Sequence, residues 1–179
     1  MQLEVYIKEF TIFRENPNTM PHSISVTAFC FVILSLSMQS QANDVEVDYL
    51  NLGENNLIAE GYDLVSYYTS NKPTKGGKHF AVHFKGSVYY FSSEKNKRVF
   101  LKNPLDYLPE YGGWCAYAIG KYGEKVSVDP LSYIVENGDL YLFYNSYFNN
   151  TKDKWIKNQT KLHHKADENW FSITNKQNP

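Results

Sequence analysis

The dipeptide Asn137-Gly138 stands between two short apolar runs, residues 132–135 and 140–144. Asn and Gly both accept the positive φ that a two-residue hairpin turn requires, and that turn matches the natural twist of paired strands. The pattern therefore predicts that the chain reverses at residues 137–138 and forms an antiparallel β-hairpin. A fold built around such a hairpin is all-β or α+β rather than a helix bundle.

A second hairpin is predicted over residues 79–92. Phe80, Val82 and Phe84 alternate with polar or small residues, which places these three apolar side chains on one face of a strand. Turn-forming residues 85–87 follow, and the apolar run 88–91 supplies the partner strand. We also expect a short strand over residues 57–59.

Helical signals occupy the rest of the chain. A turn opens after Asp63, residues 94–102 follow the potential caps Ser92 and Ser93, and Pro104 suits the first position of a helix over residues 104–109. A final helical stretch is indicated by residues at helical spacing, namely Phe148, Trp155, Ile156, Gln159 and Leu162. The expected fold is a small single α+β domain with antiparallel hairpins and three or four short helices.

The N-terminal part carries a targeting signal. Residues 24–37 are uncharged and apolar but too short for a comfortable membrane span, and small residues precede a potential cut after Ala42. We interpret residues 1–42 as a signal peptide whose true start is Met20, the alternative being an uncleaved anchor. The mature chain is then exported, periplasmic or secreted, free of the membrane, with a linker at 43–56, a domain at 57–172 and a tail at 173–179.

The charge of the mature chain excludes one class of partner. Removing residues 1–42 takes two of 18 basic and three of 19 acidic residues, which leaves 16 of each. A neutral chain gives no electrostatic reason to bind nucleic acid.

Cys115 is the one cysteine left after residue 42, within EYGGWCAYAIGKYG at residues 110–123. Three roles are open to it. A buried thiol packs as a small apolar residue, a lone thiolate binds Cu(I) with help from a partner such as histidine, and a nucleophile needs a nearby His, Lys or helix start.

Other candidate residues also carry two interpretations. His83, with His79 two residues earlier, faces outward on its strand and is either solvated or a ligand for a divalent metal. Asp63 is a cap, a ligand or an acid. Five aromatic residues either line a ligand cleft or, as we prefer, belong to a tyrosine-rich core: Tyr62, Tyr67, Trp114, Tyr117 and Tyr144. His163 and His164 diverge on a helix and are expected at the surface.

Four segments taken together resemble the exported branch of YHS-domain proteins. They are GYDLVSYY (61–68), VHFKGSVYYFSSEKNKRVFLKNPLDYLPEYGGWCAYAIG (82–120), DPLSYIVENGDLYLFYN (129–145) and KADENW (165–170). The resemblance spans residues 57–171 and implies a YHS-like fold, distantly similar to treble-clef metal-binding domains.

Cysteine-rich YHS modules, which are attached to metal-handling proteins, resemble this chain but differ at three thiolates. Their cysteines fall here at Ser66, Ser92 and Asn96. A soft-metal site cannot survive the loss of three sulfur ligands without replacements.

Three functions follow as expectations. The first is a binding protein that assists in handling copper or another transition metal, with Cys115 and His83 as ligands. The second is a metal-free module that binds a small molecule or a protein in an aromatic cleft formed by Tyr62, Asp63, Trp114, Tyr117 and Tyr144. The third is a thiol-dependent enzyme, although we expect a binding protein rather than an enzyme.

Overall fold

A computed structural model describes residues 49–70 and 72–175, all within the unit Asn43–Pro179. The expected signal peptide, its start at Met20 and its cleavage after Ala42 lie outside the described residues.

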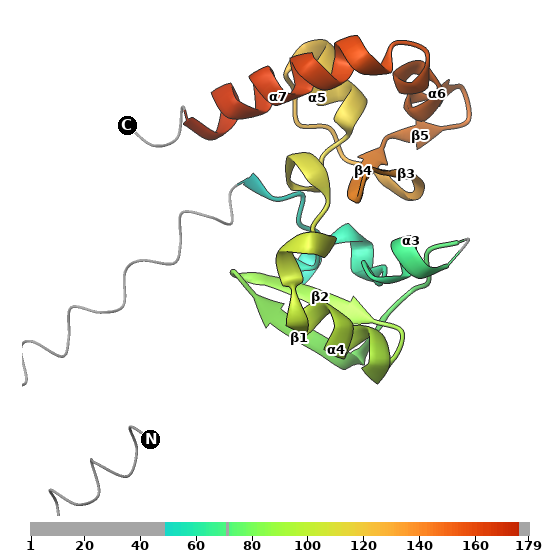
Figure 1. The fold of residues 1–179 in the computed structure, drawn as a ribbon, viewed down its shortest axis with the longest axis vertical. Helices are drawn as coiled ribbons and strands as arrows, with labels where there is room; N and C mark the ends of the chain where they lie inside the picture. The colour runs from blue at the N-terminus through green and yellow to red at the C-terminus, as the bar shows by residue number, and fades with distance from the viewer. Residues whose placement is uncertain (1–48, 71, 176–179) are drawn as a thin grey trace, which may run out of the picture. The chain divides into compact units, whose positions relative to one another are not determined.

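Three antiparallel hairpins make up the β-structure (Figure 1). Strand β1 (Gly77–Phe84) pairs with β2 (Ser87–Phe91), β3 (Asp129–Glu136) pairs with β4 (Asp139–Phe143), and β5 (Asn145–Ser146) pairs with β6 (Asn149–Asn150). At the second turn Asn137 and Gly138 have φ values of 54° and 97°. Both predicted hairpins are confirmed. The Asn-Gly pair adopts the positive φ values that a two-residue hairpin turn requires.

The helices are α3 (Ser66–Thr69), α4 (Glu94–Lys102), α5 (Ala116–Tyr122), α6 (Thr151–Ile156) and α7 (Gln159–Asn175). Ser93 caps α4, since its hydroxyl accepts a hydrogen bond from the Asn96 amide at 3.1 Å. Residues Pro104–Tyr107 form a 3-10 helix. The fold is therefore α+β with antiparallel hairpins, as expected. Across the described residues, no helix combines the length and apolar character needed to cross a membrane.

The last helical stretch starts later than its spacing suggested. Phe148 lies in the turn between β5 and β6 and is 93% exposed, rather than packing with the helix. Helix α6 begins at Thr151 because the Asn150 side chain accepts a hydrogen bond from the Asp153 amide. Helical periodicity alone does not show at which residue a helix begins, because the start depends on the capping residue.

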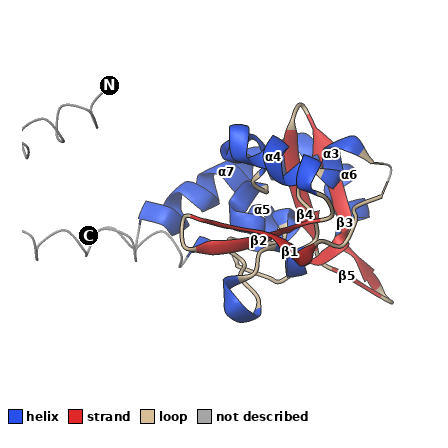
Figure 2. Ribbon diagram, turned by 90° about the horizontal axis from the view of Figure 1, so that it is seen from below, coloured by secondary structure: helices blue, strands red, loops and turns tan. Residues whose placement is uncertain are grey.

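Two hydrophobic clusters share strand β4. Leu140 and Leu142 are buried with β1, β2 and α4, whereas Tyr141 and Phe143 are buried with α5, α6 and α7. Successive side chains of a strand point to opposite faces, so one strand serves both clusters. Figure 1 shows hairpin β3–β4 beside the group of helices α5–α7, apart from hairpin β1–β2, and Figure 2 shows the same helices and strands seen from below.

Residues on both sides of the expected domain limits contact the domain. The Asn51 amide donates to the Gly112 carbonyl at 2.8 Å, and the Tyr49 hydroxyl donates to the Thr174 carbonyl at 3.0 Å. The end of the expected linker is thus held against the EYGG segment and the end of α7, and α7 itself runs on to Asn175.

Candidate functional site

Cys115 precedes α5 and is fully buried, with an exposed fraction of 0%. Its Sγ lies 3.4 Å from Thr151 Oγ1, while the Thr151 hydroxyl donates to the Tyr144 carbonyl at 2.6 Å. A hydroxyl has one proton to donate, so in the sulfur contact the thiol is the donor. Cys115 therefore acts as a hydrogen-bond donor to Thr151, and in the described part of the chain no histidine hydrogen-bonds to it.

The two expected metal ligands are not brought together. His83 is exposed on β1, and its neighbour His79 packs edge-on against Phe80 with ring centroids 4.8 Å apart. Figure 1 shows β1 and the start of α5 in separate parts of the domain. Among residues 49–70 and 72–175, no three His, Cys, Asp or Glu side chains form a group that could hold a metal. The buried Cys115 thiol and the exposed His83 imidazole are therefore not placed side by side as joint ligands.

The positions that the family resemblance assigns to cysteines converge on one carboxylate. Asp63 is fully buried, and its Oδ2 accepts hydrogen bonds from the Ser92 amide at 2.9 Å, the Ser92 hydroxyl at 2.6 Å and the Asn96 side chain at 2.7 Å. Its Oδ1 accepts from the amides of Val65 and Ser66. These five bonds explain how a charged group is tolerated in the interior.

Ser66 completes this arrangement from the other side. Its hydroxyl donates to the Asp63 backbone carbonyl at 2.6 Å and accepts from the Thr74 amide at 2.8 Å. Asp63 therefore caps the turn into α3 and ties it to the start of α4, which is the capping role rather than a free ligand role. Asp63, Ser66, Ser92 and Asn96 thus form one polar cluster, held together by hydrogen bonds among its own members.

The expected aromatic residues do not form one cleft. Lys75 Nζ lies 4.4 Å from the centroid of the Tyr62 ring, and the Trp114 indole donates to the Tyr49 carbonyl at 2.8 Å. Tyr144 contributes its carbonyl to Thr151, and Tyr117 lines a lysine-rich pocket near α5. These residues hold loops and helix starts in place, each in its own surroundings.

A ring-lined pocket is present nevertheless, beside the EYGG segment. We call it the Glu110 pocket; its volume is about 320 Å³. The residues that form it include Tyr49, Tyr89, Leu105, Leu108, Glu110, Tyr111 and Trp170. Glu110 and Tyr111 belong to the EYGG segment, whereas the rings of Tyr49, Tyr89 and Trp170 come from other parts of the chain.

Backbone geometry at Tyr111 and Gly112 shapes this pocket. Their φ values are 53° and 61°, in the left-handed region. A Cβ on Gly112 would lie 2.4 Å from the Tyr49 carbonyl oxygen, so only glycine lets the two backbones approach this closely. The conformation places Glu110 and Tyr111 on the pocket wall.

Glu110 is the polar residue of the pocket whose side chain lacks a hydrogen-bond partner among residues 49–70 and 72–175. It is half-buried, and among the described residues no group donates a hydrogen bond to its carboxylate. Burial raises the pKa of Glu110, and the nearby carboxylates of Asp139 and Asp167 raise it further, whereas His163 lowers it. The pocket therefore combines aromatic walls with one carboxyl group, that of Glu110, whose ionisation is disfavoured by burial and by two carboxylates outside the pocket lining.

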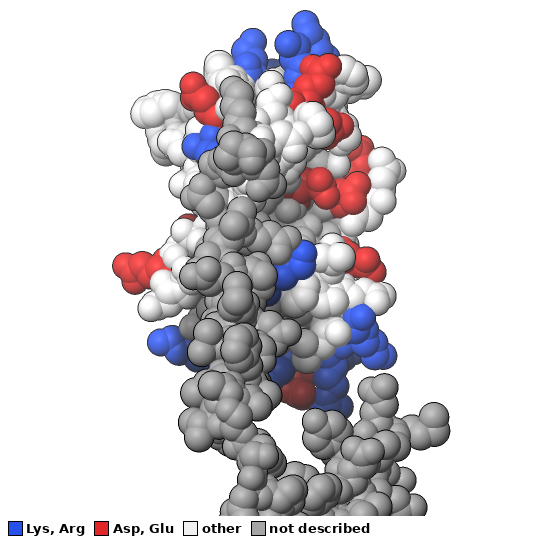
Figure 3. All heavy atoms as spheres, turned by 90° about the vertical axis from the view of Figure 1, so that its left-hand side faces the viewer, with Lys and Arg blue, Asp and Glu red and all other residues white. Residues whose placement is uncertain are grey.

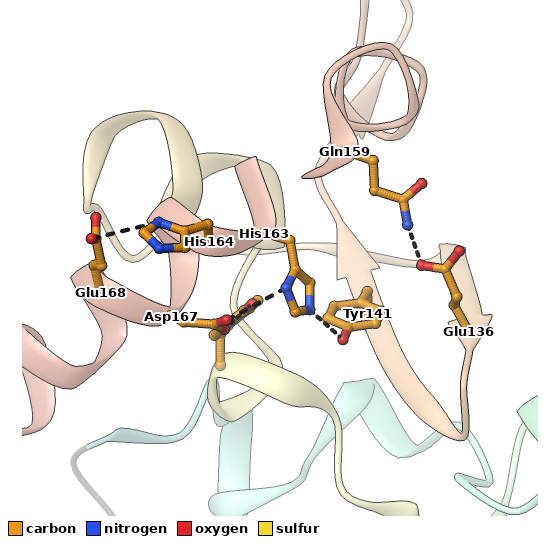
Figure 4. A network of polar contacts seen from close by, with 8 residues as sticks. Glu136, Tyr141, Gln159, His163, His164, Asp167 and Glu168 are labelled. Atoms are coloured by element: carbon orange, nitrogen blue, oxygen red, sulfur yellow. Dashed lines mark hydrogen bonds and ion pairs between the residues drawn. The ribbon is translucent and has the colours of Figure 1, made fainter. Parts of the chain in front are cut away.

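A series of polar contacts connects Tyr111 of the pocket to Asp167, His163 and Tyr141. The Tyr111 hydroxyl donates to Asp167 Oδ1 at 2.8 Å, His163 Nδ1 lies 3.4 Å from Asp167 Oδ2, and Tyr141 Oη lies 2.9 Å from His163 Nε2. Burial and the Asp167 hydrogen bond raise the pKa of Tyr111, so it stays a neutral donor. Figure 4 shows His163 turned toward Asp167 and Tyr141, while His164 points away toward Glu168.

The sequence interpretation placed both histidines at the surface. His164 is exposed and agrees with it, but His163 is half-buried against the Tyr141 and Trp155 rings, with centroids 5.6 and 6.1 Å away. The separation of His163 and Asp167 by four residues on a helix was the signal that could have revealed this pair.

The chain was compared with protein-family models, with curated protein sequences and with solved structures, and nothing among them matches it.

Proposed function

We propose that the chain is an exported binding domain whose ligand is a small organic cation with an apolar body, held in the Glu110 pocket without a metal. The observation that carries this proposal is the half-buried Glu110 carboxylate, which lies among aromatic side chains and accepts no hydrogen bond from the described residues.

The chemistry of the walls favours this class of ligand. Tyr49, Tyr111 and Trp170 present rings to the pocket, and aromatic rings attract cations electrostatically. The unpartnered carboxylate of Glu110 supplies a full negative charge when ionised, and a bound ammonium group would relieve its repulsion with Asp139 and Asp167. A neutral or anionic ligand would leave that repulsion in place.

The size of the pocket suits a compact ligand. Its volume of about 320 Å³ falls at the lower end of the roughly 300–1,000 Å³ found for small-molecule sites. Leu105 and Leu108 add apolar surface beside the rings, so the ligand should carry an aliphatic or aromatic body next to its charged group.

Calorimetric titration tests the proposal with two probes of similar size. The cationic probe is benzyltrimethylammonium, and the neutral probe is an aromatic alcohol. We expect the cation to bind and the alcohol to bind at least about tenfold more weakly, since an ion pair in a partly dry pocket is worth more than a neutral contact.

Matched variants make the result specific. Glu110→Gln should reduce the affinity for the cation to that for the alcohol, whereas Glu54→Gln, at an exposed glutamate elsewhere, should leave both unchanged. If neither probe binds, or if both variants bind the cation like the unmodified chain, the proposal fails.

Export and copper handling require their own tests. N-terminal sequencing of protein from expressing cells should show a chain that begins at Asn43.

Anaerobic Cu(I) loading of the mature chain, with and without Cys115→Ser, tests copper handling. One equivalent of bound copper that is lost on the substitution would establish Cys115 as a ligand.

A further inference from the structure

A second pocket lies where α5, α6 and α7 meet, apart from every residue of the Glu110 pocket. Its volume is about 440 Å³. Residues of α5, the end of α6 and the first half of α7 line it, and five of them are lysines, namely Lys121, Lys154, Lys157, Lys161 and Lys165. We call it the lysine pocket.

The positive charge of the lysine pocket is not neutralised by the protein. No Asp or Glu lines it, and in the described part of the chain none of the five lysines forms an ion pair with a carboxylate. The carboxylates of Asp167 and Glu168 on α7 lie instead against the histidines at positions 163 and 164. Like charges gathered on neighbouring helix turns repel one another, and an anion would remove that repulsion.

Helices α5 and α7 pack closely against each other beside the pocket. A Cβ on Gly120 would lie 2.5 Å from the Leu162 carbonyl oxygen and 3.4 Å from Ala166 Cβ, so the two helices approach closely at a residue without a side chain. Gly120 and Leu162 form part of the lining between the lysines. Lys121, Lys161 and Lys165 therefore project from a closely packed helix pair, whereas Lys154 lies on α6 and Lys157 lies in the turn that follows it.

Neutral polar groups in the pocket suit an oxyanion. The Asn158 side chain lines the pocket, as does Tyr117, whose ring centroid lies 6.0 Å from Lys154 Nζ. Amide and ammonium groups both donate hydrogen bonds, and lysine is a common partner of phosphate. Figure 3 shows basic side chains at the end of the domain where Figure 1 places α5 and α7.

We infer that the lysine pocket binds a multiply phosphorylated anion. Five unneutralised lysines exceed what one phosphate needs, and the volume admits a ligand with two or three phosphate groups. The overall neutrality of the mature chain does not oppose this, because binding depends on the local field. The inference is independent of the function proposed for the Glu110 pocket.

The phosphate groups can come from a soluble compound or from a lipid headgroup. Next to the pocket, Lys154 Nζ donates to Asn149 Oδ1 at 2.7 Å, and Asn149 follows the exposed turn residues Tyr147 and Phe148, which are 94% and 93% exposed. Exposed aromatic side chains beside lysines are suited to the surface of an anionic membrane. The experiment therefore has one arm for each source.

The first arm measures binding of inorganic tripolyphosphate by calorimetry. The second measures co-sedimentation with phosphatidylcholine vesicles with and without cardiolipin, which carries two phosphates. The test variant joins Lys121→Gln, Lys161→Gln and Lys165→Gln. Its control joins Lys78→Gln, Lys95→Gln and Lys102→Gln, three exposed lysines on β1 and α4 that give the same change in net charge.

We expect the test variant to lose at least about tenfold in affinity in the arm that shows binding, because charge-assisted hydrogen bonds are lost, and the control to lose far less. If the lipid is the source, Phe148→Ser also weakens vesicle binding and leaves tripolyphosphate unaffected. Absence of binding in both arms, or equal losses in the test variant and the control, overturns the inference.

Discussion

Cys115 Sγ lies 3.4 Å from Thr151 Oγ1, and a second hydrogen bond made by Thr151 determines which of the two groups donates. Because Thr151 gives its proton to the Tyr144 carbonyl at 2.6 Å, the thiol must donate. The residue that first suggested metal or nucleophilic chemistry thus joins the start of α5 to the start of α6. Its complete burial keeps the sulfur away from reagents in solution.

The first prediction concerns the reactivity of this thiol. In the folded mature chain Cys115 should react with a thiol reagent such as dithionitrobenzoate far more slowly than in urea, since no part of its side chain is exposed. Thr151→Val should destabilise the fold by about 1–3 kcal/mol, because it leaves the Tyr144 carbonyl without this donor. Urea unfolding followed by tryptophan fluorescence measures that cost. Rapid labelling of Cys115 by the thiol reagent in the absence of denaturant would contradict the burial of its side chain.

The second prediction tests whether the polar cluster around Asp63 occupies a site built for sulfur. The triple variant Ser66→Cys, Ser92→Cys and Asn96→Cys should bind Co(II), because the three side chains already converge on the Asp63 turn. The measurement is the intense near-ultraviolet absorption of cobalt–thiolate bonds. A matched control places the same cysteines at three exposed positions, Ser70, Glu94 and Lys102, and should show no such band. Equal absorption in both variants would show that the side chains at positions 66, 92 and 96 do not lie close together around Asp63.

Local patterns predicted much of the fold because the decisive interactions are local. Alternation across Phe80, Val82 and Phe84, and the turn at Asn137-Gly138, depend on neighbouring residues alone, and both hairpins formed. The Glu110 pocket could not be predicted in this way. Its walls join Tyr49 to Tyr111 and Trp170 across more than half of the described chain, and no short-range pattern shows which distant rings will meet.

Sequence patterns also do not show which polar groups find partners. Asp63 and Glu110 are both acidic residues near helix starts, yet Asp63 accepts five hydrogen bonds whereas Glu110 accepts none from the described residues. The difference comes from Ser92 and Asn96, which lie about thirty residues further along the chain than Asp63. Only the tertiary fold therefore separates a structural carboxylate from one available to a ligand.

The third prediction concerns Gly112. Gly112→Ala should destabilise the domain by more than about 2 kcal/mol, since the new Cβ is strained at a φ of 61° and would lie 2.4 Å from the Tyr49 carbonyl oxygen. Gly77→Ala is the matched control, because a Cβ there meets no atom within 4 Å. Chemical denaturation of the two variants should separate them clearly. Similar stabilities would show that residues around Tyr49 do not lie against the EYGG segment.

The fourth prediction uses the pH dependence of stability at Glu110. Burial first, and then Asp139 and Asp167, raise the pKa of Glu110 in the folded chain above its ordinary value of 4.5. Folding therefore favours the protonated carboxyl and disfavours the carboxylate, so ionisation of Glu110 lowers the stability of the native state as pH rises through the folded pKa. Glu110→Gln removes that penalty and should stabilise the domain at neutral pH.

The pH profile of this stabilisation decides whether burial of Glu110 is its cause. The difference between Glu110→Gln and the unmodified chain should shrink as pH falls through the folded pKa and vanish below about 4, where the carboxyl is protonated in both folded and unfolded chains. Thermal unfolding between pH 3 and pH 8, in ~0.5-unit steps, measures this profile. Glu54→Gln, at an exposed residue, should show little change at any pH. A Glu110→Gln variant that is less stable than the unmodified chain at neutral pH would mean that the carboxylate makes a favourable contact in the native state, and would remove the reason to assign it to a ligand.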